Sequence, residues 1–229
     1  MKKIGIIFAM KEELEALLDI VNVEKEYKIF ELDFYECTIG NTNCVLCESG
    51  VGKVNAARCT QILIDNMQVD YIINVGVAGG LNENLSVCDI VIGNKLVQHD
   101  FDITAFDHEK GYIPNVGKFI DGDEYLIKIA NEVARENKYT IHNGVIASGD
   151  IFCTDKNMAT KIKNKFDAYC VEMEGSSIAQ VCYLCHIPFL VLRAISDIPN
   201  GDNVITYEEF LEQSSKNVAK FISEIIYKL

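Results

Sequence analysis

Three carboxylates have the surroundings that acid–base chemistry needs, namely Glu13, Glu174 and Asp197. Asp197 follows a long apolar run, so we expect dry surroundings that raise its proton affinity, as suits a general acid. Glu174 closely follows an expected strand, so the backbone fixes its position. An acid on one side of a bond and a carboxylate base on the other, with a water between, hydrolyses a glycosidic bond with inversion. Nearby carboxylates stabilise its oxocarbenium-like transition state.

Glu13 belongs to the stretch "FAMKEELEALL", which follows an apolar strand. An apolar stripe at i, i+3, i+4 and i+7 predicts a helix there, formed by Leu14, Leu17, Leu18 and Val21. Glu12, Glu15 and Asp19 then face solvent, whereas Glu13 shares a row with Leu17 and Ile20 on the flank that faces the protein. Two interpretations stay open: Glu13 complements the helix dipole, or it is a partly buried carboxylate with a function.

Further carboxylates and glycines follow the other expected strands. The segments after the strands read "SGVGK", "GVAGG", "SGDIF" and "EMEG", and "LVLRAISD" ends in Ser196 and Asp197. In α/β folds ligands bind beyond the carboxyl ends of the strands, so these segments should converge on one edge.

Several other kinds of site fit poorly. In "SGVGK" the first glycine is misplaced for a P-loop and Val54 follows Lys53, while "GVAGG" lacks the dinucleotide fingerprint. Two C-x-x-C pairs, Cys44/Cys47 and Cys182/Cys185, are better explained as small buried hydrophobes than as zinc ligands. The first pair lies in an expected strand, where residues i and i+3 point to opposite faces, and the second lies on an apolar helix face. "HDFDITAFDH", from His99 to His108, reads as a polar loop rather than a cation site. We therefore expect no metal and no cofactor.

The elements that would position these groups alternate along the chain. Strands are expected at Ile4–Phe8, Phe34–Ile39, Cys44–Glu48, Tyr71–Val75, Ile90–Ile92, Gly144–Ala147, Ala168–Val171 and Phe189–Ile195. Helices are expected at Lys11–Val21, Val54–Met67, Glu124–Asn137, Ser176–Cys185 and Tyr207–Leu229. The last has Thr206 and Glu209 spaced as a capping box and an apolar side with Phe210, Val218, Phe221, Ile222 and Ile225. "GNTN" predicts a hairpin, and the alternation predicts a mixed, mostly parallel sheet flanked by helices.

The totals fit one domain over residues 1–229. A net charge of -13 argues against nucleic acid or an anionic membrane as partner, and no run is long enough to cross a membrane. The first residues lack a convincing signal-peptide cleavage site. Nine cysteines in such a chain indicate reduced thiols and a cytoplasmic location.

Seven motifs in register closely resemble the 5'-methylthioadenosine/S-adenosylhomocysteine nucleosidases. They are "IGIIFAMKEE", "SGVGKVNAA", "NVGVAGGL", "HDFDITAF", "ASGDIF", "VEMEG" and "RAISD", and the likeness continues through "YEEFL". The resemblance implies a three-layer nucleoside-phosphorylase-like α/β fold, a homodimer, and cofactor-free hydrolysis of the N-glycosidic bond that releases adenine. Its role would be in methionine salvage and the methyl cycle.

Residue roles follow from the same resemblance. Asp197 matches the acid that protonates adenine at N7, Glu13 the carboxylate that activates water, and Glu174 the residue that binds the ribose hydroxyls, helped by Met173 and Arg193. Phe152 and the Cys153 backbone match contacts to the base, and Met10 and Tyr207 line the thioalkyl end. The rest of the implied binding set is Val77, Ala78 and Gly79 beneath base and sugar, Glu172 and Ser196, and Phe106 and Pro114 from a partner's loop.

Some positions depart from the family pattern. Phe8 stands where glycine is common, Val77 where a small hydroxyl residue is frequent, Tyr207 where Phe is frequent, and Cys153 where an aliphatic residue is frequent. None of these removes a catalytic group, but Val77 puts in doubt a hydroxyl contact to the water or sugar, and Tyr207 could alter the preference for the 5' substituent.

The nearest alternative is a phosphate-dependent purine or uridine phosphorylase of the same fold. Such enzymes clamp phosphate with arginines, and this chain has only Arg58, Arg135 and Arg193, with Glu13 where the phosphorylases resemble one another in carrying an arginine. A non-catalytic nucleoside sensor would be expected to have lost one of the three carboxylates. Methylthioadenosine, adenosylhomocysteine, 5'-deoxyadenosine and aminodeoxyfutalosine stay open as substrates.

Overall fold

The computed structural model describes residues 2–199 and 203–229. In chain order the strands are β1 (Lys3–Phe8), β2 (Val23–Ile29), β3 (Leu32–Ile39), β4 (Thr42–Glu48), β5 (Tyr71–Gly80), β6 (Ile90–Gln98), β7 (Ile120–Asp121), β8 (Ile141–Ser148), β9 (Ala168–Glu172) and β10 (Phe189–Asp197). The helices are α1 (Lys11–Leu18), α2 (Lys53–Asp65), α3 (Glu124–Asn137), α4 (Lys156–Phe166), α5 (Gly175–Cys185) and α6 (Asn203–Lys228), with a 3-10 turn at Thr104–Phe106.

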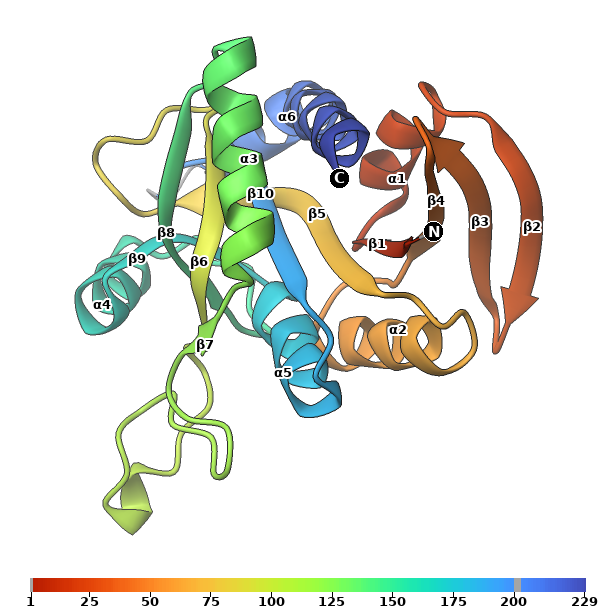
Figure 1. The fold of residues 1–229 in the computed structure, drawn as a ribbon. Helices are drawn as coiled ribbons and strands as arrows, with labels where there is room; N and C mark the ends of the chain where they lie inside the picture. Colours follow the sequence, from red (N-terminus) through yellow and green to blue (C-terminus); the bar gives the residue numbers. More distant parts are fainter. Residues whose placement is uncertain (1, 200–202) are drawn as a thin grey trace.

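The strands form a single mixed sheet that curls into a ring over part of its width. Its order is β10-β6-β8-β9-β5-β1-β4-β3-β2, with β7 beside β6, and β10 also pairs with β5, which closes the ring. Figure 1 shows the ring strands on one side and the β4–β3–β2 extension on the other. The expected α/β class with a mixed sheet is confirmed. The ring was not predicted and arises because β10 bonds to both β5 and β6.

The expectation of mostly parallel pairing also needs correction. β1 is parallel to β4 and β5, β10 to β5, and β8 to β6 and β9. The pairs β10–β6, β2–β3, β3–β4, β5–β9 and β6–β7 are antiparallel. Parallel and antiparallel pairs are therefore equally frequent among the described strands. The predicted "GNTN" hairpin joins β3 to β4, with Gly40 at positive φ in the turn.

Helices cover both faces of the sheet, and side chains alternate along each strand to meet them. In β1, Ile4, Ile6 and Phe8 pack in the core cluster that contains Leu17 of α1 and Phe221 of α6. Ile7 points the other way, into the cluster with α2 and α5. Cys44 and Cys47 likewise belong to opposite clusters, as the strand interpretation requires. Eight cysteines are free thiols: Cys37, Cys44, Cys47, Cys59, Cys88, Cys170, Cys182 and Cys185.

Several element boundaries differ from the sequence-based expectations. α1 ends at Leu18, so Ile20 lies beyond it and is 55% exposed. β5 continues five residues past Val75, through "GVAGG" to Gly80. α6 begins at Asn203, so Thr206 lies inside the helix and the expected capping box there is wrong. Four of the five apolar side chains predicted for α6 are buried, but Phe210 is 37% exposed.

Apart from the short β7 and the 3-10 turn, β2 and α4 were missed, for different reasons. β2, "VEKEYKI", is an edge strand whose two faces are largely exposed, so no apolar alternation marks it. α4 is short and lysine-rich, and only Ala159, Ile162 and Phe166 form its buried face. Its start is nevertheless signalled by Asp155, whose side chain accepts a hydrogen bond from the Met158 amide at 2.7 Å.

The segment between β6 and β7 extends away from the rest of the chain as an irregular loop, seen at the bottom of Figure 1. It contains the "HDFDITAF" motif and the 3-10 turn at Thr104–Phe106. Among the described residues, none of the helices has the length and apolar character required to cross a membrane.

Candidate active site

A cavity of about 500 Å³ opens where β1, β5, β9 and β10 end and where α6 begins. Twelve of the predicted site residues line it: Met10, Glu13, Val77, Ala78, Gly79, Phe152, Glu172, Met173, Glu174, Ser196, Asp197 and Tyr207. They come from segments far apart in the sequence, which the parallel strands β1, β5 and β10 bring to one edge. The predicted convergence of these segments is therefore confirmed.

Glu13 is buried and is held by three backbone amides. Its Oε2 accepts hydrogen bonds from the amides of Ala9 at 2.9 Å and Met10 at 3.1 Å, and its Oε1 accepts one from Val77 at 3.0 Å. The side chain thus caps α1 and also links α1 to β5. Both interpretations of Glu13 hold structurally, because it is a helix-capping group and a buried carboxylate in the cavity wall.

The close approach of Glu13 to β5 depends on a glycine. A Cβ at Gly76 would lie 2.7 Å from Glu13 Oε1, nearer than a carbon and an oxygen can approach. The first glycine of "GVAGG" therefore leaves room for the carboxylate.

Burial raises the pKa of Glu13, and the Arg193 guanidinium and the amide donors partly oppose that rise. A carboxylate with a raised pKa takes up a proton more readily than an ordinary one. Its environment therefore suits a general base.

Asp197 ends β10 and is only 1% exposed, which confirms the expectation of dry surroundings. The Ser196 hydroxyl lies 2.8 Å from Asp197 Oδ1 and can donate a hydrogen bond to it. The same hydroxyl lies 3.4 Å from the Ala78 carbonyl, so one serine links the acid to β5. Both Asp197 and Glu13 face the same cavity.

Glu174 is the N-cap residue of α5 and lies beside a second buried glutamate, Glu172. Glu174 Oε1 accepts a hydrogen bond at 2.9 Å from the Gly52 amide, which belongs to the "SGVGK" motif. Burial and the neighbouring Glu172 carboxylate raise the pKa of Glu174 to about 8. The glycine-rich segment that resembled a phosphate loop thus donates a hydrogen bond to a carboxylate instead.

Arg193 lies behind the cavity wall and is fully buried. Its guanidinium donates to the Glu172 carboxylate and, at 2.5 Å, to the Asn74 side-chain oxygen, and Glu174 Oε2 lies 3.9 Å away. Burying a guanidinium is costly unless it is paired, and here two glutamates pair with it. Arg193 is not among the described residues that line the cavity, and its contact with Glu174 is the only link to the sugar site that the structure gives it among the described residues.

Aromatic side chains border the open side of the cavity. The rings of Phe152 and Tyr207 meet edge to face, with centroids 5.4 Å apart. The Tyr207 hydroxyl lies 3.1 Å from Met10 Sδ, which brings the start of α6 against the end of β1. Phe152 is 44% exposed, so one ring face remains available for stacking.

Three other predicted residues lie elsewhere. Cys153 borders a small space of about 20 Å³ that shares Phe152 and Asp197 with the main cavity. Phe106 and Pro114 lie on the projecting loop, outside the cavity lining, and Phe106 is 76% exposed. The structure therefore brings neither loop residue to the cavity of its own chain.

Five lining residues were not predicted: Ala9, Val51, Val171, Val204 and Glu208. Val51 lies within the "SGVGK" motif, and Glu208 lies within "YEEFL", so both were in motifs already singled out. Val204 and Glu208 are one helical turn apart and became recognisable only once α6 was seen to begin at Asn203.

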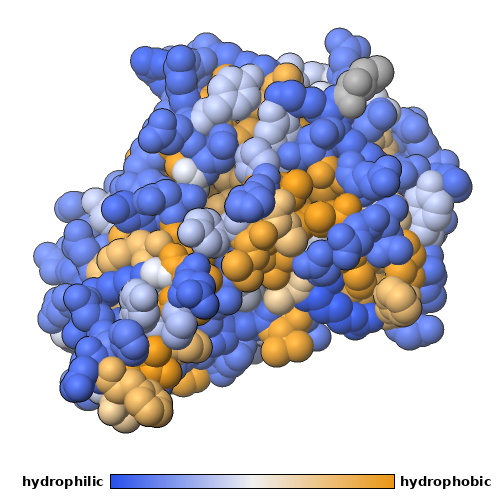
Figure 2. Space-filling view, turned by 60° about the horizontal axis from the view of Figure 1, so that its bottom comes forward, coloured by the Kyte–Doolittle hydropathy of each residue, from blue (hydrophilic) through white to orange (hydrophobic). Residues whose placement is uncertain are grey.

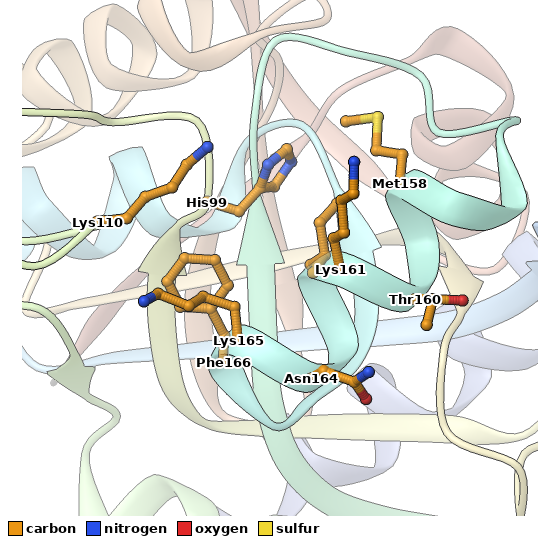
Figure 3. A pocket seen from close by; sticks show the side chains of 9 residues that line it. His99, Lys110, Met158, Thr160, Lys161, Asn164, Lys165 and Phe166 are labelled. Atoms are coloured by element: carbon orange, nitrogen blue, oxygen red, sulfur yellow. The ribbon is translucent and has the colours of Figure 1, made fainter. Parts of the chain in front are cut away.

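A second cavity, of about 560 Å³, lies between α4 and the projecting loop. Figure 3 shows Lys161 and Lys165 from α4, Lys110 from the loop, and the His99 ring around it. No group of three or more metal-ligating side chains was found in the described part of the chain, so the "HDFDITAFDH" segment has no cation cage there. Lys53, the P-loop candidate, pairs with Asp100 at 2.7 Å instead.

Known proteins of similar sequence and structure support the resemblance. The phosphorylase superfamily model matches residues 3–227. The 5'-methylthioadenosine/S-adenosylhomocysteine nucleosidase of Geobacillus sp. (strain WCH70) is 39% identical, with 99% of each chain covered.

Solved structures agree closely with this fold. The Helicobacter pylori nucleosidase bound to a pyrrolidine inhibitor has a TM-score of 0.97 at 36% identity and covers 100% of this chain and 99% of its own. The futalosine hydrolase of the same organism has a TM-score of 0.97 at 37% identity, with 100% and 98% covered. The chain therefore belongs to the phosphorylase superfamily and, within it, to the 5'-methylthioadenosine/S-adenosylhomocysteine nucleosidases.

Proposed function

We propose that this protein hydrolyses the N-glycosidic bond of 5'-methylthioadenosine and S-adenosylhomocysteine, and also that of 5'-deoxyadenosine. The products are adenine and the 5'-substituted ribose, which would serve methionine salvage and the methyl cycle. The observation that carries the proposal is that Glu13 and Asp197, both buried, line one cavity of about 500 Å³. An acid and a base on one cavity are what hydrolysis of a glycosidic bond requires.

Asp197 protonates the departing base. Its carboxylic acid gives a proton to adenine N7 while the C1'–N9 bond breaks and its electron pair moves onto the base. The Ser196 hydroxyl, which can donate to Asp197 Oδ1, stabilises the carboxylate that remains. This acid step also makes adenine a neutral leaving group.

Glu13 activates the attacking water. As water adds to C1', the carboxylate removes one of its protons, and three amide donors hold the carboxylate in place. The raised pKa of Glu13 supports this role because a more basic carboxylate takes a proton from water more readily. Val77 contributes its backbone amide to this arrangement.

The remaining cavity residues would position the nucleoside. Glu174 would accept hydrogen bonds from the ribose hydroxyls with the Met173 backbone beside it, while Phe152 stacks on adenine and the Cys153 backbone bonds to the base edge. Val77, Ala78 and Gly79 would lie beneath base and sugar, and Met10 and Tyr207 would contact the thioalkyl group. The lining of the cavity supports this assignment.

We also propose a cytoplasmic homodimer in which Phe106 and Pro114 complete the cavity of the partner. The projecting loop and its exposed Phe106 support this arrangement. Figure 2, which brings the bottom of Figure 1 forward, shows apolar side chains near the middle of a largely hydrophilic face. Eight free cysteines fit a reducing compartment.

A phosphorolytic reaction fits this cavity poorly. Phosphate is bound by arginines in bidentate geometry, and the described lining has no arginine, lysine or histidine. Arg193 is committed to glutamates, Arg58 donates to the Phe30 carbonyl, and Arg135 is exposed on α3.

Following free adenine from purified protein incubated with methylthioadenosine, with and without phosphate, tests the reaction type. We expect equal rates in both. Strict dependence on added phosphate would make the enzyme a phosphorylase.

Aminodeoxyfutalosine is a second candidate substrate because the Helicobacter pylori futalosine hydrolase matches this fold as well as the nucleosidase does. It carries the same adenine and ribose, so the groups that act on the bond cannot distinguish it. Only the part of the cavity that meets the 5' substituent can.

A further inference from the structure

The charges of the cavity lining all have one sign. Five carboxylates line it, Glu13, Glu172, Glu174, Asp197 and Glu208, and its described part includes no cationic side chain. Four of the five are at most 6% exposed and belong to the networks described above. Glu208 differs because it is exposed and has no role in those networks.

Glu208 lies at the end of the cavity that the thioalkyl group would occupy. It directly follows Tyr207, whose hydroxyl reaches Met10 Sδ, and it lies one helical turn after Val204. Residues four apart share a helix face, and both Val204 and Glu208 line the cavity. A substituent that extends past Met10 and Tyr207 therefore meets an apolar wall and then a carboxylate.

Nearby cations do not neutralise this end of the cavity. Lys11 follows Met10 in the chain, but its ammonium is exposed and lies 3.0 Å from Glu15. Lys53 at the start of α2 pairs with Asp100. Glu208 itself has no ion pair with any described residue.

We propose that Glu208 selects the 5' substituent by charge, favouring a substituent with an ammonium group and disfavouring one with a carboxylate alone. This inference rests on the proposed nucleosidase function. The ammonium of S-adenosylhomocysteine would pair with Glu208 while its carboxylate stays in solvent. Aminodeoxyfutalosine, whose 5' substituent ends in a benzoate, would meet like charge and be a poor substrate.

The test compares three 5'-thioadenosines of similar size, bearing 3-aminopropyl, propyl and 2-carboxyethyl groups. We expect kcat/KM for the amine to exceed that for the acid by about five- to twentyfold at low salt, since each exposed charge interaction contributes several-fold at most. Screening at about 0.5 M salt should reduce this ratio to about twofold. The neutral propyl compound is the reference for every enzyme variant.

Glu208→Gln should bring the ratio of kcat/KM for the amine to kcat/KM for the acid close to one. It should also raise kcat/KM for aminodeoxyfutalosine relative to the propyl compound. Glu209→Gln is the matched control, because Glu209 is exposed, carries the same charge and lies outside the described lining. It should leave the ratio unchanged.

The outcomes separate the two proposals. If the propyl compound releases no adenine, the proposed function itself fails. If it does, equal kcat/KM for amine and acid overturns the charge selection. A ratio that survives Glu208→Gln, or that Glu209→Gln reduces equally, overturns the assignment to Glu208.

Discussion

Two cavities in the described part of this molecule have similar volumes, about 500 and 560 Å³, but opposite chemistry. The first is lined by buried carboxylates that backbone amides and Arg193 hold in place. The second is lined by lysines, of which Lys161 and Lys165 are exposed on α4, and by the buried His99, whose Nε2 has no hydrogen-bond partner among the described residues.

The difference shows that volume alone does not identify a reactive site. A buried carboxylate costs free energy unless it is hydrogen-bonded, so a chain that buries several with amide donors has positioned them. Exposed lysines carry no desolvation cost and keep their rotamer freedom, so their side chains are not held in one position. We therefore expect changes in the first cavity to affect turnover strongly and changes in the second to affect it little.

The largest effect is expected for Asp197→Asn. Loss of the general acid should lower kcat by about 10³-fold, because the base would leave without its proton. Adenine binding, measured by calorimetry, should largely persist since the amide keeps the shape of the carboxyl. The exposed Asp121→Asn is the control, and unchanged turnover in Asp197→Asn would remove Asp197 from the mechanism.

The next effect separates two neighbouring glutamates on α1. Glu13→Gln should lower kcat/KM by about 10²-fold or more, because the amide cannot take a proton from water. Glu12→Gln, an identical change on the exposed face, should stay within about twofold. Steady-state adenine release measures both, and equal losses would refute the assignment from helix faces.

A smaller effect concerns stability and pH. The pKa of Glu174 is about 8 in the folded protein against an ordinary 4.5, so between these values the folded state holds a proton that the unfolded chain has lost. The stabilisation from this proton is complete below pH 4.5 and disappears as the pH rises through 8.

Glu174→Gln removes that dependence while keeping an oxygen for the Gly52 amide. The Tm of the variant minus that of the wild type should therefore increase from pH 5 to pH 8.5, by about 2 to 4 °C for each kcal/mol that the wild type loses, measured by calorimetry. A difference that is constant over this range would show that Glu174 titrates normally.

The smallest effect is expected in the second cavity. Lys161→Gln and Lys165→Gln, alone or together, should change kcat/KM for methylthioadenosine by less than about twofold, as surface substitutions commonly do. A tenfold loss would mean that the lysine-lined cavity is coupled to the first, and the contrast between the two cavities would no longer hold.

Local patterns were sufficient to predict many elements and the three central carboxylates. The apolar stripe of α1 correctly placed Glu12 and Glu15 in solvent and Glu13 inside, and the apolar run of β10 predicted the burial of Asp197. Of the twelve predicted residues that line the cavity, eleven lie in motifs at strand ends and Tyr207 lies in α6; most of them were given by the family resemblance rather than by local patterns. The edge strand β2 and the lysine-rich α4 carried too little apolar pattern to be recognised.

By itself, the sequence determined most of the inward-facing side chains along the strands and helices with a strong apolar pattern, because those patterns depend on periods of 2.0 and 3.6 residues. Only the tertiary structure decided how β10 closes the ring with β5 and β6, because strand pairing joins segments distant in the chain. It also decided that Arg193 serves Glu172 and Glu174 and that Glu208 faces the cavity. Charged side chains interact through space, so their partners depend on three-dimensional positions, which the local periodicity of the sequence does not determine.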